Sequence, residues 1–427
     1  MKKYLLCLLL ISFSLLGTGL TDFALSVWIL DQPGSSVTSY SLVWFFQAAP
    51  AVLLSPFIGS LVDRWEKKKI IILGQLGAGI GSFSLMLIHF QGLLEPWHIM
   101  GVAAISSVAN MFVFRAFYVS IVTLVSKVNL VKANGLSSTL YSIVQIGVPV
   151  AAPVLYKLIG LEKIFLIDIF TFLVSIIIFM FISLGAVPRS VEKFNLKADF
   201  KSVVAFMKEK KGFIPLTVFF FIISFLIGLI QVLFTPLILD FSNEYVLGSV
   251  LAFAGTGSLI GGIVMSSKKS FHNPLKGIAT LSMCMGVVLL ASFTYVNTYV
   301  LAIGGMLMLM MFTIVSVINS SFVQTIVPVD MQGRVSGFAT LFIGIAAPAA
   351  YLLAGILVDS LKYLFNEFDL TFFNRFPGST VTASIITIFA ISGGILFLIS
   401  MSFRKSESVK NLDSIYHDEL ESSHAPV

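Results

Sequence analysis

Three ionisable residues, Asp22, Arg115 and Asp168, lie inside long apolar stretches of the sequence. A charged side chain at the centre of a lipid bilayer costs roughly 3 kcal/mol or more unless it is paired or hydrated, so such residues usually have a function. An apolar surrounding favours the neutral form of a carboxylate, whereas a neighbouring cation favours the charged form. Asp22 and Arg115 are therefore candidates for proton coupling, with protonation of Asp22 competing against the attraction of Arg115.

Each of these residues also has a structural interpretation. Asp22 and Arg115 can form a static ion pair that only fixes helix packing, and Asp168 is either a second proton site or a polar group that reaches the membrane interface. The second half of the chain has no charged residue deep in an apolar stretch. Any proton coupling is therefore expected in the first half.

The composition is that of a polytopic membrane protein. Of the 427 residues, 57% are hydrophobic and only 11% are charged, whereas about a quarter of the residues in a soluble domain are charged. The formal net charge of +6 comes from scattered basic residues, a pattern that does not suit nucleic-acid binding. Cys7 and Cys284 form no paired motif, and the five His residues lie in polar stretches or the tail. We therefore expect no metal, no cofactor and no enzymatic site.

A membrane-spanning helix needs about 20 apolar residues, and the sequence contains twelve such runs. The first continues from residue 4 to residue 30 without a small-residue cleavage site, which favours an uncleaved helix over a secretory signal peptide. The others lie near residues 40–62, 70–91, 97–125, 133–157, 163–187, 214–239, 245–266, 275–295, 299–327, 335–359 and 379–403.

The basic residues predict the orientation of these spans. Lys and Arg concentrate in cytoplasmic loops of membrane proteins. An even number of spans places both termini on one side, and we expect that side to be the cytoplasm. All 27 Lys and Arg residues then fall in cytoplasmic segments, except Arg115, Lys157, Lys163, Lys362 and Arg375.

The spans divide into two groups of six. We expect a six-helix bundle over residues 1–187, a cytoplasmic linker over 188–213, a second bundle over 214–403 and a cytoplasmic tail over 404–427. Phe200, Val203 and Met207 recur at helical spacing in the linker, which indicates a basic amphipathic helix on the inner leaflet, or alternatively a solvated linker.

The two halves share short sequence matches that indicate a duplicated unit. Gly59-Ser60-Leu61-Val62 in the first half recurs as Gly257-Ser258-Leu259-Ile260 in the second. Gly257 and Gly261 have the spacing of small residues that let two membrane helices approach closely.

A dense group of charges follows the second span. The sequence Asp63-Arg64-Trp65-Glu66-Lys67-Lys68 resembles the loop between helices 2 and 3 of major facilitator superfamily transporters. Glu66 stands where the general motif has Gly, and an acidic residue there is similar to the subfamily of enterobactin and macrolide exporters. Three further segments resemble that subfamily: Val128 with Lys132-Ala133-Asn134-Gly135, Phe165-Leu166-Ile167-Asp168, and Val327-Pro328 to Gly333-Arg334-Val335.

This resemblance implies an all-α membrane protein with twelve transmembrane helices in two six-helix halves and a substrate site between them. It places Asp22 and Arg115 on helices that line the central cavity, and Asp63 at a cytoplasmic gate that faces the start of helix 11. The gate residues implied are Gly59, Asp63, Arg64, Lys67, Lys68 and Arg334. The cavity residues implied are Asn110, Tyr118, Phe221, Phe225, Gln231, Met308 and Asn319.

We therefore expect a proton-coupled secondary active exporter, an antiporter of a bulky amphipathic small molecule such as a siderophore, a peptide-like metabolite or an antibiotic. It would work by alternating access, as a monomer, among the lipids of the bacterial cytoplasmic (inner) membrane. Two alternatives stay open. One is a lysophospholipid flippase with the same fold, and the other is a non-transporting membrane receptor on the same scaffold.

Overall fold

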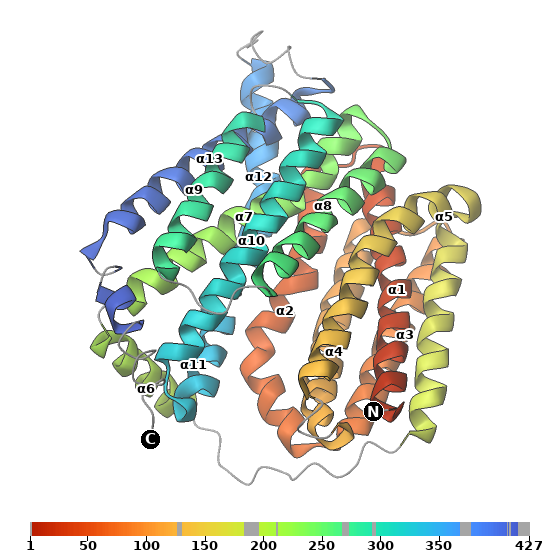
Figure 1. Ribbon diagram of the computed structural model, residues 1–427. Helices are drawn as coiled ribbons and strands as arrows, with labels where there is room; N and C mark the ends of the chain where they lie inside the picture. The colour runs from red at the N-terminus through yellow and green to blue at the C-terminus, as the bar shows by residue number, and fades with distance from the viewer. Residues whose placement is uncertain are drawn as a thin grey trace. The chain divides into compact units, whose positions relative to one another are not determined.

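The computed structural model describes residues 2–125, 130–182, 196–210, 212–266, 273–292, 296–367, 377–407, 409 and 411–416. Within these residues the chain forms thirteen helices (Figure 1), which confirms the predicted all-α fold. They are α1 (Lys2–Asp31), α2 (Val37–Arg64), α3 (Lys67–Phe90), α4 (Pro96–Leu124), α5 (Leu130–Phe181), α6 (Leu196–Glu209), α7 (Phe213–Phe241), α8 (Glu244–Ser266), α9 (Pro274–Ser292), α10 (Thr298–Ile326), α11 (Val329–Phe342), α12 (Ala346–Glu367) and α13 (Thr380–Lys405).

Among the described residues, 11 helical segments are long and apolar enough to cross a membrane, and one of them provides two crossings. The segment Leu140–Phe181 has 42 residues, about twice the length that spans a bilayer. Gly160 interrupts it with φ 76°, a left-handed conformation that glycine adopts readily. Figure 1 shows α5 turning back on itself between its two limbs. These limbs correspond to the spans expected near 133–157 and 163–187.

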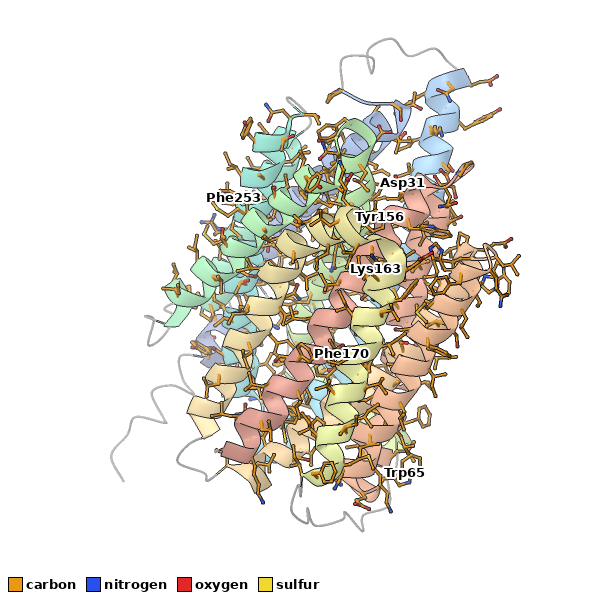
Figure 2. The ribbon with its side chains drawn as sticks, turned by 90° about the vertical axis from the view of Figure 1, so that its right-hand side faces the viewer. Asp31, Trp65, Tyr156, Lys163, Phe170 and Phe253 are labelled. Atoms are coloured by element: carbon orange, nitrogen blue, oxygen red, sulfur yellow. The ribbon has the colours of Figure 1, made fainter. Side chains whose placement is uncertain are left out.

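The contacts divide the chain into two compact units. Unit 1 contains residues 1–194 and 244–252, and unit 2 contains residues 195–243 and 253–427. In unit 1 the largest fully buried side chains come mainly from α1, α2 and α5, and the rings of Tyr4 in α1 and Phe117 in α4 stack at 5.9 Å. Figure 2 shows Asp31 and Lys163 towards one end of this unit and Trp65 at the opposite end. The loops that the charge pattern assigns to opposite sides of the membrane thus lie at opposite ends.

Helix packing within unit 2 depends on glycine at several crossings. A Cβ on Gly257 of α8 would overlap the carbonyl oxygen of Met306 in α10, and one on Gly261 would lie 2.7 Å from the carbonyl oxygen of Met310. Gly286 of α9 meets the backbone of Gly393 in α13 in the same way. Backbones that approach this closely exclude any larger side chain, so the close packing expected of Gly257 and Gly261 is confirmed.

The linker helix α6 packs on protein. Val203, Phe206 and Met207 are buried, and the Phe206 ring lies 5.5 Å from that of Phe213 at the start of α7. Phe200 is 56% exposed, but its ring lies 5.5 Å from that of Phe338 in α11. The predicted amphipathic helix is therefore present, but its placement on the inner leaflet is wrong, because most of its apolar face covers α7 and α11.

The start of the tail also packs on unit 2. Leu412 and Tyr416 are buried, and the Tyr416 ring stacks on Phe322 of α10 at 5.6 Å. Asp413 Oδ1 accepts a hydrogen bond from the backbone N–H of Leu275 at 3.1 Å, in the first turn of α9, where the helix dipole favours an anion. Burial raises the pKa of the Tyr416 phenol, and its hydrogen bond with Thr325 opposes that shift. The docked tail therefore favours the neutral phenol, and this contribution to stability is lost only as the pH rises through the folded-state pKa.

A carboxylate at the end of α7 holds the start of α13. Asp240 accepts hydrogen bonds from the backbone N–H and hydroxyl groups of Ser379, at 2.8 and 2.7 Å. It accepts the same two kinds of bond from Thr382, at 3.1 and 2.7 Å. Gly378, with φ +85°, leaves room for this arrangement, because a Cβ there would lie 2.7 Å from Asp240 Oδ2.

Asp240→Ala is expected to destabilise unit 2 by about 2 kcal/mol, because it leaves the first N–H groups of α13 without their acceptor. Thermal unfolding of the purified protein in detergent measures the loss. Glu367→Ala, at an exposed carboxylate of α12, is the matched control and should leave the transition in place. Equal transitions for the two variants would show that the Asp240 contacts contribute no net stability.

Candidate functional site

A row of polar residues runs along one face of α1. Ser14, Thr18 and Asp22 recur every fourth residue, a spacing that places all three on one side of a helix. Each is bonded to a polar side chain of another helix in unit 1. The result is a set of polar contacts inside an apolar bundle, where each group needs a partner.

Asp22 is half-buried and bonded to α2. Gln47 Nε2 donates a hydrogen bond to Asp22 Oδ2 at 2.8 Å. Both residues lie within membrane-spanning segments, at Lys3–Asp31 and Val37–Ile58. A neutral amide can bond to either the charged or the protonated form of the carboxylate, so this contact does not fix Asp22 in one state.

Asp168 is enclosed among three helices. It lies in the second limb of α5 and is 1% exposed. Ser82 Oγ from α3 donates to Oδ2 at 2.7 Å, and Thr18 Oγ1 from α1 donates to Oδ1 at 3.3 Å. A Cβ on Gly17 would lie 2.9 Å from Oδ1, so glycine at that position makes room for the carboxylate. The interpretation that Asp168 reaches the membrane interface is therefore wrong.

The contact of the row nearest the start of α1 joins α1 to α3. Ser14 Oγ donates to Oε1 of Gln75 at 2.9 Å, and both residues are buried. About two turns of α5 beyond Asp168, Ser175 Oγ donates to the backbone oxygen of Leu10 at 3.0 Å. These contacts fix α1 against its neighbours and thereby position Thr18 and Asp22.

Arg115 does not join this row. Its side chain is exposed on α4, and the structure gives no ion pair between Arg115 and Asp22. The static ion pair considered from the sequence is therefore absent. A guanidinium is always charged and would be costly against lipid, so an exposed Arg in the span Pro96–Ile121 requires a hydrated surface.

The expected cavity residues have mixed environments. Tyr118 on α4 is 67% exposed, whereas Met308 on α10 is only 9% exposed and offers little open surface. Gln231 on α7 accepts a hydrogen bond from the Tyr351 hydroxyl of α12 at 3.0 Å. The oxygen Oδ1 of Asn319 is buried without a hydrogen bond. Asn110, Phe221 and Phe225 are partly buried, and the Phe221 ring lies 5.4 Å from that of Phe342.

Comparison with known proteins identifies the family. The family model of the Major Facilitator Superfamily matches residues 7–351, which is most of the chain. The chain belongs to the Major Facilitator Superfamily. It is thus a multi-pass membrane transporter, and the resemblance found in its charged loop is confirmed.

Two curated relatives of this superfamily member carry the name macrolide efflux protein A. The protein from Streptococcus pyogenes is 23% identical over 355 residues, covering 82% of this chain and 87% of the relative. The protein from Enterococcus faecalis is 27% identical over 261 residues, covering 60% of this chain and 80% of the relative.

Solved structures of other transporters share the fold of this superfamily member. The nucleoside transporter NupG has a TM-score of 0.71 at 13% identity, covering 94% of this chain and 98% of NupG. A bacterial homologue of the iron transporter ferroportin has a TM-score of 0.68 at 11% identity, covering 95% and 99%. At these identities the likeness establishes the fold alone.

In this superfamily member the lysines of the charged loop are bonded within unit 1. Lys67 is buried and donates to the backbone oxygen of Trp65 at 3.2 Å. Lys68 donates to the backbone oxygen of Met180 at 2.7 Å, near the end of α5, where the helix dipole favours a cation. The Trp65 ring stacks on Phe112 of α4 at 6.4 Å. The side chains of the other expected gate residues, Gly59, Asp63, Arg64 and Arg334, lie outside the described part of the structure.

Five residues of the polar row and its partners were not predicted from the sequence: Ser14, Thr18, Gln47, Gln75 and Ser82. They are uncharged, and a Ser or Thr within a membrane helix often bonds only to its own backbone, so no single one stands out. The four-residue spacing of Ser14, Thr18 and Asp22 was the available signal.

Proposed function

We propose that this superfamily member is a proton-coupled exporter of a bulky amphipathic small molecule, with Asp22 as the proton carrier. The observation that carries the proposal is a half-buried carboxylate inside a membrane span whose bonded partner is a neutral amide. Because no basic side chain of the described residues pairs with it, this carboxylate is free to alternate between its charged and protonated forms. Two relatives that bear the name macrolide efflux protein A support export and a macrolide-like substrate class.

Coupling follows because protonation of Asp22 and binding of the substrate oppose each other. Protonated Asp22 is neutral, whereas ionised Asp22 adds one negative charge to the polar row of α1. A cationic or amphipathic substrate binds better to the ionised form. Binding of a proton from outside then releases the substrate, and loss of that proton to the cytoplasm prepares the next cycle.

The remaining elements of the proposal concern orientation and gating. Both termini lie in the cytoplasm, the transporter resides in the bacterial inner membrane, and it acts as a monomer by alternating access. The distribution of Lys and Arg supports the orientation. Asp63 acts at the cytoplasmic gate, a role supported by the loop resemblance. A lysophospholipid substrate and a receptor function are the alternatives that the experiment must exclude.

The proposal is tested by untargeted mass spectrometry of medium and cell extract from a deletion strain carrying empty vector, wild type or Asp22→Asn. We expect one metabolite to leave the cell with wild type and to accumulate inside with the other two strains. A shift confined to lysophospholipids would favour the flippase. An unchanged set of metabolites, with altered signalling output, would favour the receptor.

A further inference from the structure

Hydroxyl oxygens converge on Asp168 from two sides. The Thr18 hydroxyl approaches from α1 and the Ser82 hydroxyl from α3, each bonded to one carboxylate oxygen. Thr21 lies three residues after Thr18, on the same face of α1. The two carboxylate oxygens of Asp168 are therefore bonded to two hydroxyl groups, and a third hydroxyl lies on the same face of α1.

Thr21 provides a second, independent indication of a ligand. Its side chain is 4% exposed, and its hydroxyl oxygen makes no hydrogen bond of standard geometry in the structure. A buried hydroxyl without a partner costs free energy, so such groups usually serve a bound water, ion or ligand. Thr21 follows Gly17, which borders Asp168 Oδ1, by one helical turn, and the Asp168 side chain is itself 1% exposed.

The negative charge of Asp168 indicates that a ligand of this site would be a cation. Asp168 makes no ion pair with Lys or Arg in the described part of the chain, so its negative charge is stabilised by hydroxyl hydrogen bonds and is not neutralised by a cation of the protein. Among the described residues no group of three or more His, Cys, Asp or Glu side chains is placed to hold a metal ion. One enclosed carboxylate and several neutral oxygens suit a monovalent hard cation better than a divalent one.

We propose that Asp168, Thr18, Thr21 and Ser82 form a sodium-binding site within unit 1. Oxygen atoms are the ligands that sodium takes in transporters. Bound sodium would neutralise Asp168, satisfy the Thr21 oxygen and join α1, α3 and the second limb of α5. Gly17 supports the site because its missing side chain leaves the space beside Asp168 Oδ1. This site is separate from the proton carrier, and its existence does not depend on the direction or substrate of transport.

The test measures sodium binding without transport. Purified protein in detergent is unfolded thermally in NaCl, LiCl, KCl or choline chloride at constant pH and ionic strength. Since a ligand that binds only the folded state stabilises it, saturating NaCl should raise the melting temperature of wild type by about 3 °C or more over choline. KCl should match choline. Asp168→Asn and the isosteric Thr21→Val should abolish the sodium response.

Ser175→Ala is the matched control. Ser175 is buried in the same limb of α5 and bonds α1 through the Leu10 oxygen, but it lies outside the pocket. This variant should keep the full sodium response even if its baseline stability falls. A wild type without a sodium-specific shift, or an equal shift in Asp168→Asn, would overturn the proposal. Stability that responds to pH but to no alkali cation would show that Asp168 holds only a proton.

Discussion

Asp22→Asn is expected to reduce uphill efflux roughly 100-fold or more while the protein still folds. Asparagine keeps the shape of the side chain and its contact with Gln47, but it can neither release nor accept a proton. Transport against a gradient in inverted membrane vesicles, energised by a proton gradient, measures the loss. Substrate binding to the purified variant should be weaker than to wild type at neutral pH, because the amide mimics the protonated carboxylate that releases the substrate.

Asp31→Asn is the control for this experiment. It makes the same chemical change on the same helix, at the exposed end of α1 and outside the polar row. Efflux by this variant should stay near wild type. If Asp31→Asn were as inactive as Asp22→Asn, loss of charge anywhere on α1 would explain the defect, and the specific role of Asp22 would fail.

Gly257→Val should prevent stable folding of unit 2, with a cost of about 3 kcal/mol or more. A Cβ at this position would overlap the Met306 carbonyl oxygen, which belongs to the rigid backbone of α10 and cannot rotate away. The yield of monodisperse protein after detergent extraction, together with its melting temperature, reports the effect. Gly262→Val on the same helix is the control, because a Cβ there meets nothing within 4 Å. Comparable yields of the two variants would contradict the packing described for α8 and α10.

The sequence predicted the membrane spans well because apolar runs of sufficient length have few other uses in a protein. The spans near 133–157 and 163–187 match the limbs of α5 on either side of Gly160. For helix α6, the surface against which it packs could not be predicted in this way. Spacing identified the apolar face that contains Val203 and Met207, but spacing cannot distinguish a lipid surface from a protein surface.

The charged residues of the candidate site could be predicted from the sequence, but the neutral residues that form hydrogen bonds with them could not. Asp22, Arg115 and Asp168 could be identified because a charged side chain inside a membrane span has a high free-energy cost and therefore needs an explanation. Which charges meet depends on helix rotation, which the sequence does not report, so Arg115 was assigned to Asp22 although Gln47 is the bonded partner. Neutral hydrogen-bonding groups such as Ser82 carry no comparable signal and were found only from the structure.

The most direct test of proton coupling through Asp22 uses purified protein reconstituted into liposomes with an acidic lumen. The substrate is the compound that leaves the deletion strain only when wild-type protein is present. Wild type should accumulate this compound in the lumen, a protonophore should release it, and Asp22→Asn should take up no more than empty liposomes. Accumulation by Asp22→Asn equal to that of wild type, or accumulation that persists after the pH gradient collapses, would contradict the account.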